Sequence, residues 1–416
     1  MGLIVVLSVL CAGFLGLGYL QGPKLSDAQV DSTAVVERTG QQLRLFANQA
    51  VAQVDPEQVV MTPDVAHSVT TEGDVIAVQF DARLDYGTQY RVQIDGVTSV
   101  YQAQPSTLSY EFTTSTPPLY YVDRGDPDEI VRTTIDSTER TVVYSGAGIQ
   151  EFALFEGLVA VVTVSDDGTS AIDLVSLADG AVERLSLPYP GVVGNVAAAS
   201  SGSVLGFTLA ADPDSPVLFT VDLDTTRVAQ PVTGLDGQPT IVTAWEFVPG
   251  ATTLLAINAE HTLLQVDPAV PGAVTPLGQS DELGPISADG ATVTVGDIYS
   301  YHALTIATGD REPLTASPLE GEIAFLGPTQ VLSGGNRVEK IATTEPGTTR
   351  YFSAMVYDDG VESRLLYRAP DGGSIESFSV SPNEQYVAVS TDTMTFFVDI
   401  DSGATVKSVE GFHPAW

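Results

Sequence analysis

An apolar strand that ends near an aspartate, followed by a small polar turn and a second short strand, recurs seven times after residue 118. The copies are spaced mostly about 40 to 55 residues apart, which is the period of one β-propeller blade. They are Leu119–Asp123, Ala171–Val175, Val217–Asp222, His261–Asp267, His302–Ile306, Tyr351–Tyr357 and Thr393–Asp399. The pattern therefore predicts an all-β fold in which residues 119–416 form a seven-bladed propeller.

The two ends of this repeat region predict how the ring closes. The first unit, Leu119–Gly146, has only three strands of its own. We expect His413–Trp416 to supply the missing strand, because closure removes exposed strand edges. Phe412–Trp416 resembles the start of an inner strand in TolB-type propellers, and Ser379–Val389 resembles their S-P-D-G turn. The resemblance implies a TolB-like or WD-repeat-like bacterial propeller. The irregular stretch 321–371 leaves six or eight blades as alternatives.

Short strands with alternating apolar and polar residues fill residues 32–116, which is the pattern of half-buried antiparallel strands in a β-sandwich. This region resembles a bacterial Ig-like domain of cell-surface proteins, and the resemblance implies a spacer or adhesion module. The residues that carry it are Val54–Pro56, Val60–Pro63, Leu84–Tyr90 and Tyr110–Thr114. Together the two resemblances imply an envelope protein of actinobacterial type.

Residues 1–21 are predicted to be a transmembrane anchor or signal segment. Residues 2–20 are almost continuously apolar, and 19 residues of helix span roughly 28 Å, enough to cross a bilayer core. No Lys or Arg precedes this run, so the native start is expected upstream. Residues 9–12, which include Cys11, weakly resemble a lipobox, so lipidation of Cys11 is an alternative. A cleaved signal peptide is a further alternative. All three place the rest of the chain on the extracytoplasmic side, and the favoured uncleaved anchor predicts a single-pass cell-membrane protein.

The chain is strongly acidic, with 53 acidic and 17 basic residues and a formal net charge of −36. Such a polyanion repels nucleic acid and anionic lipid surfaces, so neither is an expected partner. The charge fits a solvated extracellular surface or a surface that binds cations. Cys11 is the only cysteine and the four histidines lie far apart in sequence, so no zinc pattern is present.

Calcium is the one cofactor for which the sequence offers candidate ligands. The pairs Asp399 with Asp401 and Asp222 with Asp224 place carboxylates two residues apart on predicted turns. The alternative is that these aspartates accept hydrogen bonds from the turn backbone. No complete calcium-loop motif is present.

No catalytic residue is predicted. An α/β-hydrolase elbow is absent, and we find no cluster of His, Arg, Tyr and carboxylates on neighbouring inner strands. Trp245 and Trp416 are expected in inner strands, packed between blades. We therefore expect a binding or scaffold protein whose propeller engages a protein, peptide or envelope polymer. The alternative is an envelope glycan lyase or hydrolase with its site at the propeller channel. The sequence indicates no oligomeric state.

Overall fold

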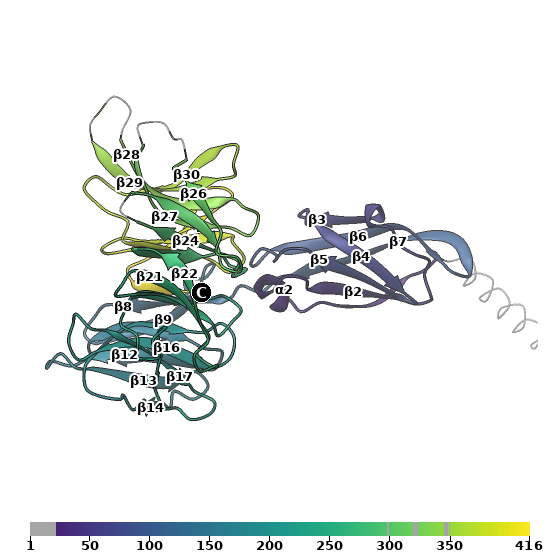
Figure 1. Ribbon diagram of the computed structural model, residues 1–416. Coiled ribbons are helices and arrows are strands. Elements are labelled where there is room, and N and C mark those ends of the chain that lie inside the picture. Colours follow the sequence, from purple (N-terminus) through teal and green to yellow (C-terminus); the bar gives the residue numbers. More distant parts are fainter. Residues whose placement is uncertain (1–21, 298, 318, 320–322, 345–347, 349) are drawn as a thin grey trace, which may run out of the picture. The chain divides into compact units, whose positions relative to one another are not determined.

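The computed structural model describes residues 22–416 apart from positions 298, 318, 320–322, 345–347 and 349. The chain divides into two compact units, Met1–Pro117 and Pro118–Trp416 (Figure 1). The segment 1–21, with the predicted anchor and Cys11, lies outside the described residues. Among the residues that the structure describes, no helix is both long and apolar enough to span a bilayer.

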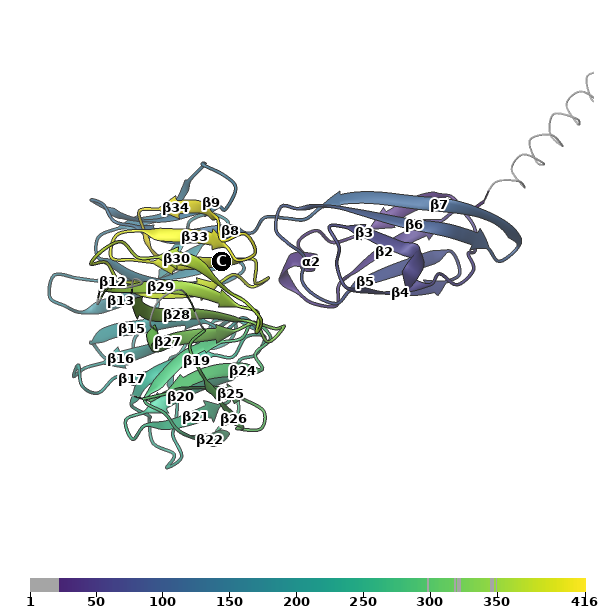
Figure 2. The ribbon, with the colours of Figure 1, turned by 90° about the horizontal axis from the view of Figure 1, so that it is seen from above.

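The first unit consists of two antiparallel sheets, in the strand orders β1-β2-β5-β4 and β3-β6-β7. Its strands are β1 Leu25–Gln29, β2 Gln42–Ala47, β3 Val59–Thr62, β4 His67–Glu72, β5 Val75–Phe80, β6 Gln89–Ser99 and β7 Gln102–Thr113. Two short helices, α2 Ala34–Glu37 and η1 Pro56–Gln58, connect them (Figure 2).

The two sheets of the first unit bury one face each. Strand β2 alternates exposed and buried residues, with Leu43 and Leu45 inside, as expected of a strand with one wet face. The rings of Phe80 on β5 and Phe112 on β7 lie 6.3 Å apart, so the buried faces of the two sheets meet. The predicted alternation within residues 32–116 therefore corresponds to a two-sheet core.

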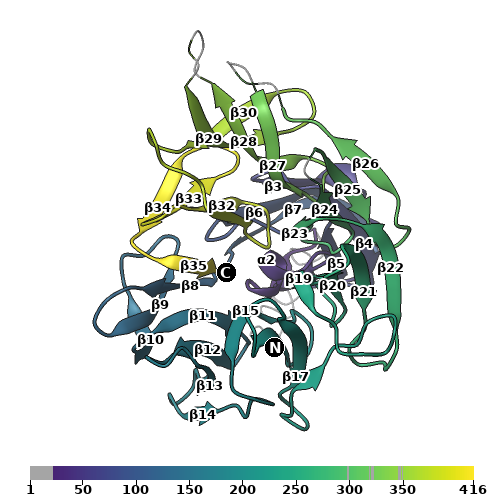
Figure 3. The ribbon, with the colours of Figure 1, turned by 60° about the vertical axis from the view of Figure 1, so that its left-hand side comes forward.

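The second unit contains, within its described residues, seven four-stranded antiparallel sheets that follow one another along the chain. Six sheets use consecutive strands: β11 to β14, β15 to β18, β19 to β22, β23 to β26, β27 to β30 and β31 to β34. The remaining sheet has the order β10-β9-β8-β35 and so joins the two ends of the unit. Figure 3 shows β35, in yellow, beside β8, in blue. The repeat pattern thus corresponds to a β-propeller.

The bounds of the strands follow the repeats that the sequence indicates. The first four sheets contain β8 Pro118–Asp123, β9 Asp128–Thr134, β10 Thr141–Gly146, β35 Phe412–Ala415, β11 Ile149–Leu154, β12 Leu158–Val164, β13 Ser170–Ser176, β14 Val182–Arg184, β15 Val192–Ala198, β16 Val204–Ala210, β17 Val217–Asp222, β18 Gln230–Pro231, β19 Val242–Phe247, β20 Leu254–Asn258, β21 Thr262–Val266 and β22 Val274–Gln279. The others contain β23 Glu282–Ile286, β24 Thr292–Gly296, β25 Tyr301–Thr305, β26 Arg311–Leu314, β27 Ile323–Val331, β28 Arg337–Thr344, β29 Tyr351–Asp358, β30 Ser363–Arg368, β31 Ser377–Val380, β32 Tyr386–Ser390, β33 Thr395–Asp399 and β34 Thr405–Val409.

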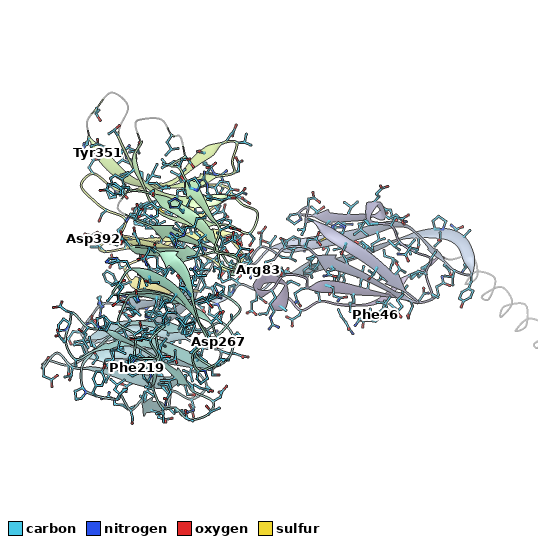
Figure 4. The ribbon with its side chains drawn as sticks, in the orientation of Figure 1. Phe46, Arg83, Phe219, Asp267, Tyr351 and Asp392 are labelled. Carbon is cyan, nitrogen blue, oxygen red and sulfur yellow. The ribbon has the colours of Figure 1, made fainter. Side chains whose placement is uncertain are left out.

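The core of the second unit lies between neighbouring sheets. The second strands β12, β16, β20 and β32 are covered on both faces, so their sequences are nearly unbroken apolar runs, as in β16, VLGFTLA. Phe207 of β16 stacks on Phe219 of β17 with ring centroids 5.8 Å apart. Figure 4 labels Phe219 in this part of the second unit. Both rings belong to an apolar cluster that also contains residues of the preceding sheet, β11 to β14. Apolar burial between sheets thus holds the repeats together.

Candidate functional site

The strands nearest the centre of the ring are β35, β11, β15, β19, β23, β27 and β31 (Figure 3). In the described residues, all of them except β31 carry a shift in register against the next strand outward. Three of the shifts fall at prolines, Pro285, Pro328 and Pro414. Proline has no N–H to donate to the ladder, so it is accommodated at a bulge.

At two of these bulges, one residue has an unusual backbone conformation, which redirects its side chain. Asn195 on β15 and His413 on β35 have φ angles of 51° and 50°, in the left-handed region that L-residues enter at a cost of about 1–2 kcal/mol. Both side chains are exposed. Because a propeller surrounds a central channel, exposed residues on its innermost strands face that channel or its rim. Backbone strain of this kind is concentrated at functional sites.

The His413 ring lies close to two charged side chains from neighbouring segments. Burial among protein atoms lowers the pKa of His413, the Glu151 carboxylate on β11 opposes this shift, and the Arg124 guanidinium adds to it. Arg124 lies in the β8–β9 loop, with its guanidinium carbon 5.7 Å from the centroid of the Phe412 ring. The pKa below the usual value leaves a neutral imidazole at pH 7, which can donate and accept one hydrogen bond each.

Arg124 and Asp128 fix this end of the innermost strands. The Arg124 Nη1 lies 3.1 Å from the Asp128 Oδ2 and also donates to the carbonyl oxygen of Ile149, the first residue of β11. The Ile149 N–H donates to the same Asp128 oxygen at 3.1 Å. The loop after β8 is therefore tied to the start of β11, beside the start of β35.

Glu151 links the cluster to the next sheet. Its Oε2 accepts a hydrogen bond of 2.8 Å from the backbone N–H of Val196 on β15. That N–H lies within the β15 bulge, where the register between β15 and β16 shifts between Gly194 and Ala197. The carboxylate thus holds the bulge that directs Asn195. Arg124, His413, Glu151 and Asn195 form a set from three adjacent sheets, which we call the channel cluster.

Glu246 on β19 is the acidic residue of the next sheet along. Its side chain is exposed to solvent, yet the protein atoms around it raise the pKa of its carboxyl to about 7. Among the described residues, Glu246 has no hydrogen-bond or ion-pair partner.

The channel cluster corrects one expectation from the sequence. We found no group of His, Arg and carboxylate on neighbouring inner strands, but His413 and Glu151 occupy adjacent innermost strands with Arg124 beside them. The three residues are separated in sequence, and only the pairing of β35 with β8 brings them together. Aligning His413–Trp416 as the missing strand against β8 was the signal that could have revealed the cluster.

The calcium candidates serve as turn residues in this structure. Asp222 Oδ1 accepts hydrogen bonds from the backbone N–H groups of Asp224 and Thr225, at 2.9 and 3.1 Å. Asp399 Oδ1 accepts from the N–H and the hydroxyl of Ser402, at 2.8 and 2.6 Å. Asp401 and Asp224 are exposed. Within the described ranges, no three His, Cys, Asp or Glu side chains gather around a possible metal position.

The two tryptophans pack against other rings. Trp245 on β19 is 9% exposed and meets the Phe247 ring edge-on, with 5.3 Å between the ring centroids. Trp416, after β35, stacks on Tyr386 with centroids 6.4 Å apart and meets Phe397 edge-on at 5.5 Å. Trp245 is therefore a packing residue, and half-buried Trp416 has Tyr386 stacked against its ring.

A surface cleft of about 750 Å³ lies at the ends of the outer strands in the sheet β11 to β14. Its lining includes Ser165, Asp166, Arg184 and Tyr189, and none of the lining residues belongs to an innermost strand. The Arg184 guanidinium is held by Asp173 through two hydrogen bonds, Nε to Oδ1 at 2.8 Å and Nη2 to Oδ2 at 2.9 Å. The cleft is thus built around an already neutralised cation.

No protein-family model and no curated protein matches the chain. Several solved structures are similar, and these neighbours include TolB-like and WD40-like β-propellers. TolB from Acinetobacter baumannii is 15% identical, with 86% of this chain and 82% of that chain covered and a TM-score of 0.41. The periplasmic gluconolactonase PpgL of Pseudomonas aeruginosa is 15% identical, with 72% and 97% covered and a TM-score of 0.45. The β-propeller domain of Cps50 (Swd1) from Myceliophteria thermophila is 15% identical, with 64% and 88% covered and a TM-score of 0.44. Similarity at this level says nothing about what this chain binds or catalyses.

Proposed function

We propose that this chain is an extracytoplasmic binding protein whose seven-bladed propeller, closed by β35, engages a protein, peptide or envelope polymer at the start of its innermost strands. The channel cluster is the observation that carries this proposal. Arg124, His413, Glu151 and Asn195 offer hydrogen-bond donors, acceptors and charges on three adjacent sheets whose second strands are apolar. Polar groups that converge within an apolar ring are the usual construction of a ligand site.

In this proposal, the first unit is a spacer. We assign residues 25–116, which begin with β1, to an Ig-like sandwich and residues 1–21 to the segment that anchors the chain in the membrane or directs its export. The stiff Thr116–Pro118 segment, with two prolines in succession, separates the sandwich from the propeller. The net charge of −36 keeps such a surface solvated and repels other polyanions.

Site-specific crosslinking in the native envelope tests this function. A photoreactive benzophenone amino acid replaces Val192 at the start of β15, whose side chain is 48% exposed. The matched control replaces Val406 on the outermost strand β34, whose side chain is 46% exposed. We expect Val192 to capture a partner that Val406 does not. Equal or absent capture from the two positions contradicts a ligand site at the innermost strands.

An envelope glycan lyase or hydrolase is the second candidate, and the pairing of His413 with Glu151 favours it. A neutral imidazole beside a carboxylate is the usual arrangement of a general base. Turnover of an isolated envelope glycan by the purified chain, lost in His413→Gln, supports this candidate. Unchanged turnover in that variant assigns the activity elsewhere.

A further inference from the structure

The described chain begins beside the tip of the hairpin that β6 and β7 form. The Ser106 hydroxyl on β7 donates a hydrogen bond of 2.5 Å to the carbonyl oxygen of Pro23, two residues before β1. A Cβ atom on Gly22 would lie 2.7 Å from the carbonyl oxygen of Gln104, so the two backbones are in contact there. The chain leaves the unit from the opposite end of the hairpin, after Thr113. The entry of the chain and the hairpin tip therefore lie together.

Two exposed apolar side chains form the tip of this hairpin. Val100 is 56% exposed and Tyr101 is 77% exposed. Hairpin turns usually contain Gly, Asn or Asp, so the turn itself does not require large apolar side chains. Ala103 and Pro105, which follow on β7, are exposed as well. The tip thus presents a run of apolar side chains that the fold of the unit does not bury.

Hydrogen bonds to the β2–β3 loop hold the tip in place. The Val100 N–H and the Ser99 hydroxyl both donate to the carbonyl oxygen of Ala50, at 3.2 and 3.0 Å. The Tyr101 N–H donates to the Ser99 hydroxyl at 3.2 Å. Ser99 also forms an isolated β-bridge with Val51 of the same loop. Both residues of the turn therefore project from a fixed support.

The hairpin tip differs in charge from the chain as a whole, whose formal net charge is −36. Residues 96–110 contain no charged side chain, and the adjoining loop residues 48–52 contain none either. Lys24, beside the tip, is exposed. The carboxylates at this end, Glu72 and Asp74, belong to the β4–β5 turn of the other sheet. Charges beyond about 8 Å are screened at physiological salt, so the tip meets a lipid surface without the repulsion expected of the whole chain.

We propose that Val100 and Tyr101 insert into the interface of a lipid bilayer, so that the β6–β7 hairpin makes a second membrane contact beside the anchor. This inference rests on the proposed function, in which residues 1–21 anchor the chain. Residues 2–20 are almost continuously apolar, and Gly22, the first residue described, contacts the hairpin. A bilayer that holds the anchor therefore has its surface at the hairpin tip. Tyrosine suits this position because its ring is apolar and its hydroxyl remains hydrated.

Tryptophan fluorescence of the full chain in liposomes tests this contact. Tyr101→Trp and Val100→Trp each add one tryptophan at the tip to the two of the native chain. The matched control is Thr39→Trp, because Thr39 is exposed in the turn before β2, at the end of the unit away from the β2–β3 loop. Each chain is reconstituted in phosphatidylcholine liposomes with and without bromine on the acyl chains, which quenches nearby rings. The emission of the native chain is subtracted from each spectrum.

We expect the bromines to reduce the added emission of both tip variants at least about 2-fold, because an interfacial ring lies about 5–10 Å deep, at the acyl boundary. The added emission of Thr39→Trp should change by less than about 1.2-fold, since a ring in water is out of reach of the acyl chains. Equal quenching at the two ends, or no quenching at the tip, overturns the hairpin contact.

Flotation of the native chain with the same liposomes separates failure of this inference from failure of the anchor. A chain that floats without quenching at the tip keeps the anchor and loses the hairpin contact. A chain that does not float loses both assignments. The propeller ligand is tested independently, because capture at Val192 does not depend on the hairpin.

Discussion

The innermost strands and the second strands of the propeller sheets are built differently. The second strands β12, β16, β20, β24 and β32 are regular and almost wholly buried. The innermost strands β15, β19 and β23 mix exposed and buried residues, and β35 has exposed and half-buried ones. All four contain bulges. Regular apolar strands provide stability, whereas the irregular strands direct polar groups to the centre at a cost in backbone strain. Substitutions should therefore separate the two roles.

Strand β35 is an irregular innermost strand that also completes the sheet joining the two ends of the second unit. Its removal should therefore have the largest effect on stability. Deleting residues 412–416 leaves β8 without its inner partner and removes Trp416 from Tyr386 and Phe397. We expect the free energy of unfolding to fall by more than about 4 kcal/mol, beyond a single large-to-small core substitution.

Thermal and urea unfolding of the purified chain measure this effect. The control, Trp416→Phe, keeps a ring against Tyr386 and Phe397 and should cost less than about 1.5 kcal/mol. A deletion whose melting midpoint stays within about 2 °C of the full chain would show that β35 does not close the ring.

Two phenylalanines on strands of the two classes sharpen the comparison. Phe207 on β16 is 0% exposed, and Phe207→Ala should cost about 3–5 kcal/mol because it leaves a cavity beside Phe219. Phe325 on the innermost strand β27 is 65% exposed, and Phe325→Ala should cost less than about 0.5 kcal/mol. Urea unfolding of both variants measures the difference. Similar losses for the two variants would remove the distinction between the strand classes.

The sequence predicts the regular part of this molecule better than the irregular part. The period of the repeats indicates the propeller because most second strands are apolar where they pack between two sheets, as Val204–Ala210 is. The missing strand of the first unit leads to Phe412–Ala415, which pairs with β8. Both inferences depend on burial, which can be inferred directly from the residue types.

The channel cluster could not be derived in the same way. The directions of Asn195 and His413 depend on local bulges, and one residue of shift turns a side chain to the other face. The neighbours of His413 come from β11 and from the β8–β9 loop, which are remote from it in sequence. That Glu246 has no hydrogen-bond or ion-pair partner in the described part of the chain is likewise a property of packing.

Close packing at the base of the site can be tested at glycines. A methyl group at Gly206 on β16 collides with the Trp245 ring and comes within 3.0 Å of Phe247 Cε2. Gly206→Ala should therefore cost about 1–3 kcal/mol through overpacking. The control is Gly157→Ala, where nothing lies within 4 Å of the added carbon. Urea unfolding should leave the control within about 0.5 kcal/mol of the native chain, and equal costs would refute tight packing around Trp245.

Substitution of Glu246 should have the smallest effect on the free energy of unfolding, and this effect should depend on pH. Its carboxyl pKa rises from 4.5 to about 7 in the folded chain because protein atoms displace water around it. The folded state therefore holds the proton more tightly, so this group stabilises the fold below pH 4.5 and loses that contribution as pH rises through about 7.

Glu246→Gln keeps the neutral form at every pH. Relative to this variant, the native chain should lose about 1 kcal/mol between pH 4.5 and pH 8, a value reduced to allow for the solvent contact of the side chain. Urea unfolding at both pH values measures the change, and Glu312→Gln, at an exposed position on β26, is the matched control. A pH-independent difference between the native chain and Glu246→Gln would mean that Glu246 is as well hydrated as a surface acid.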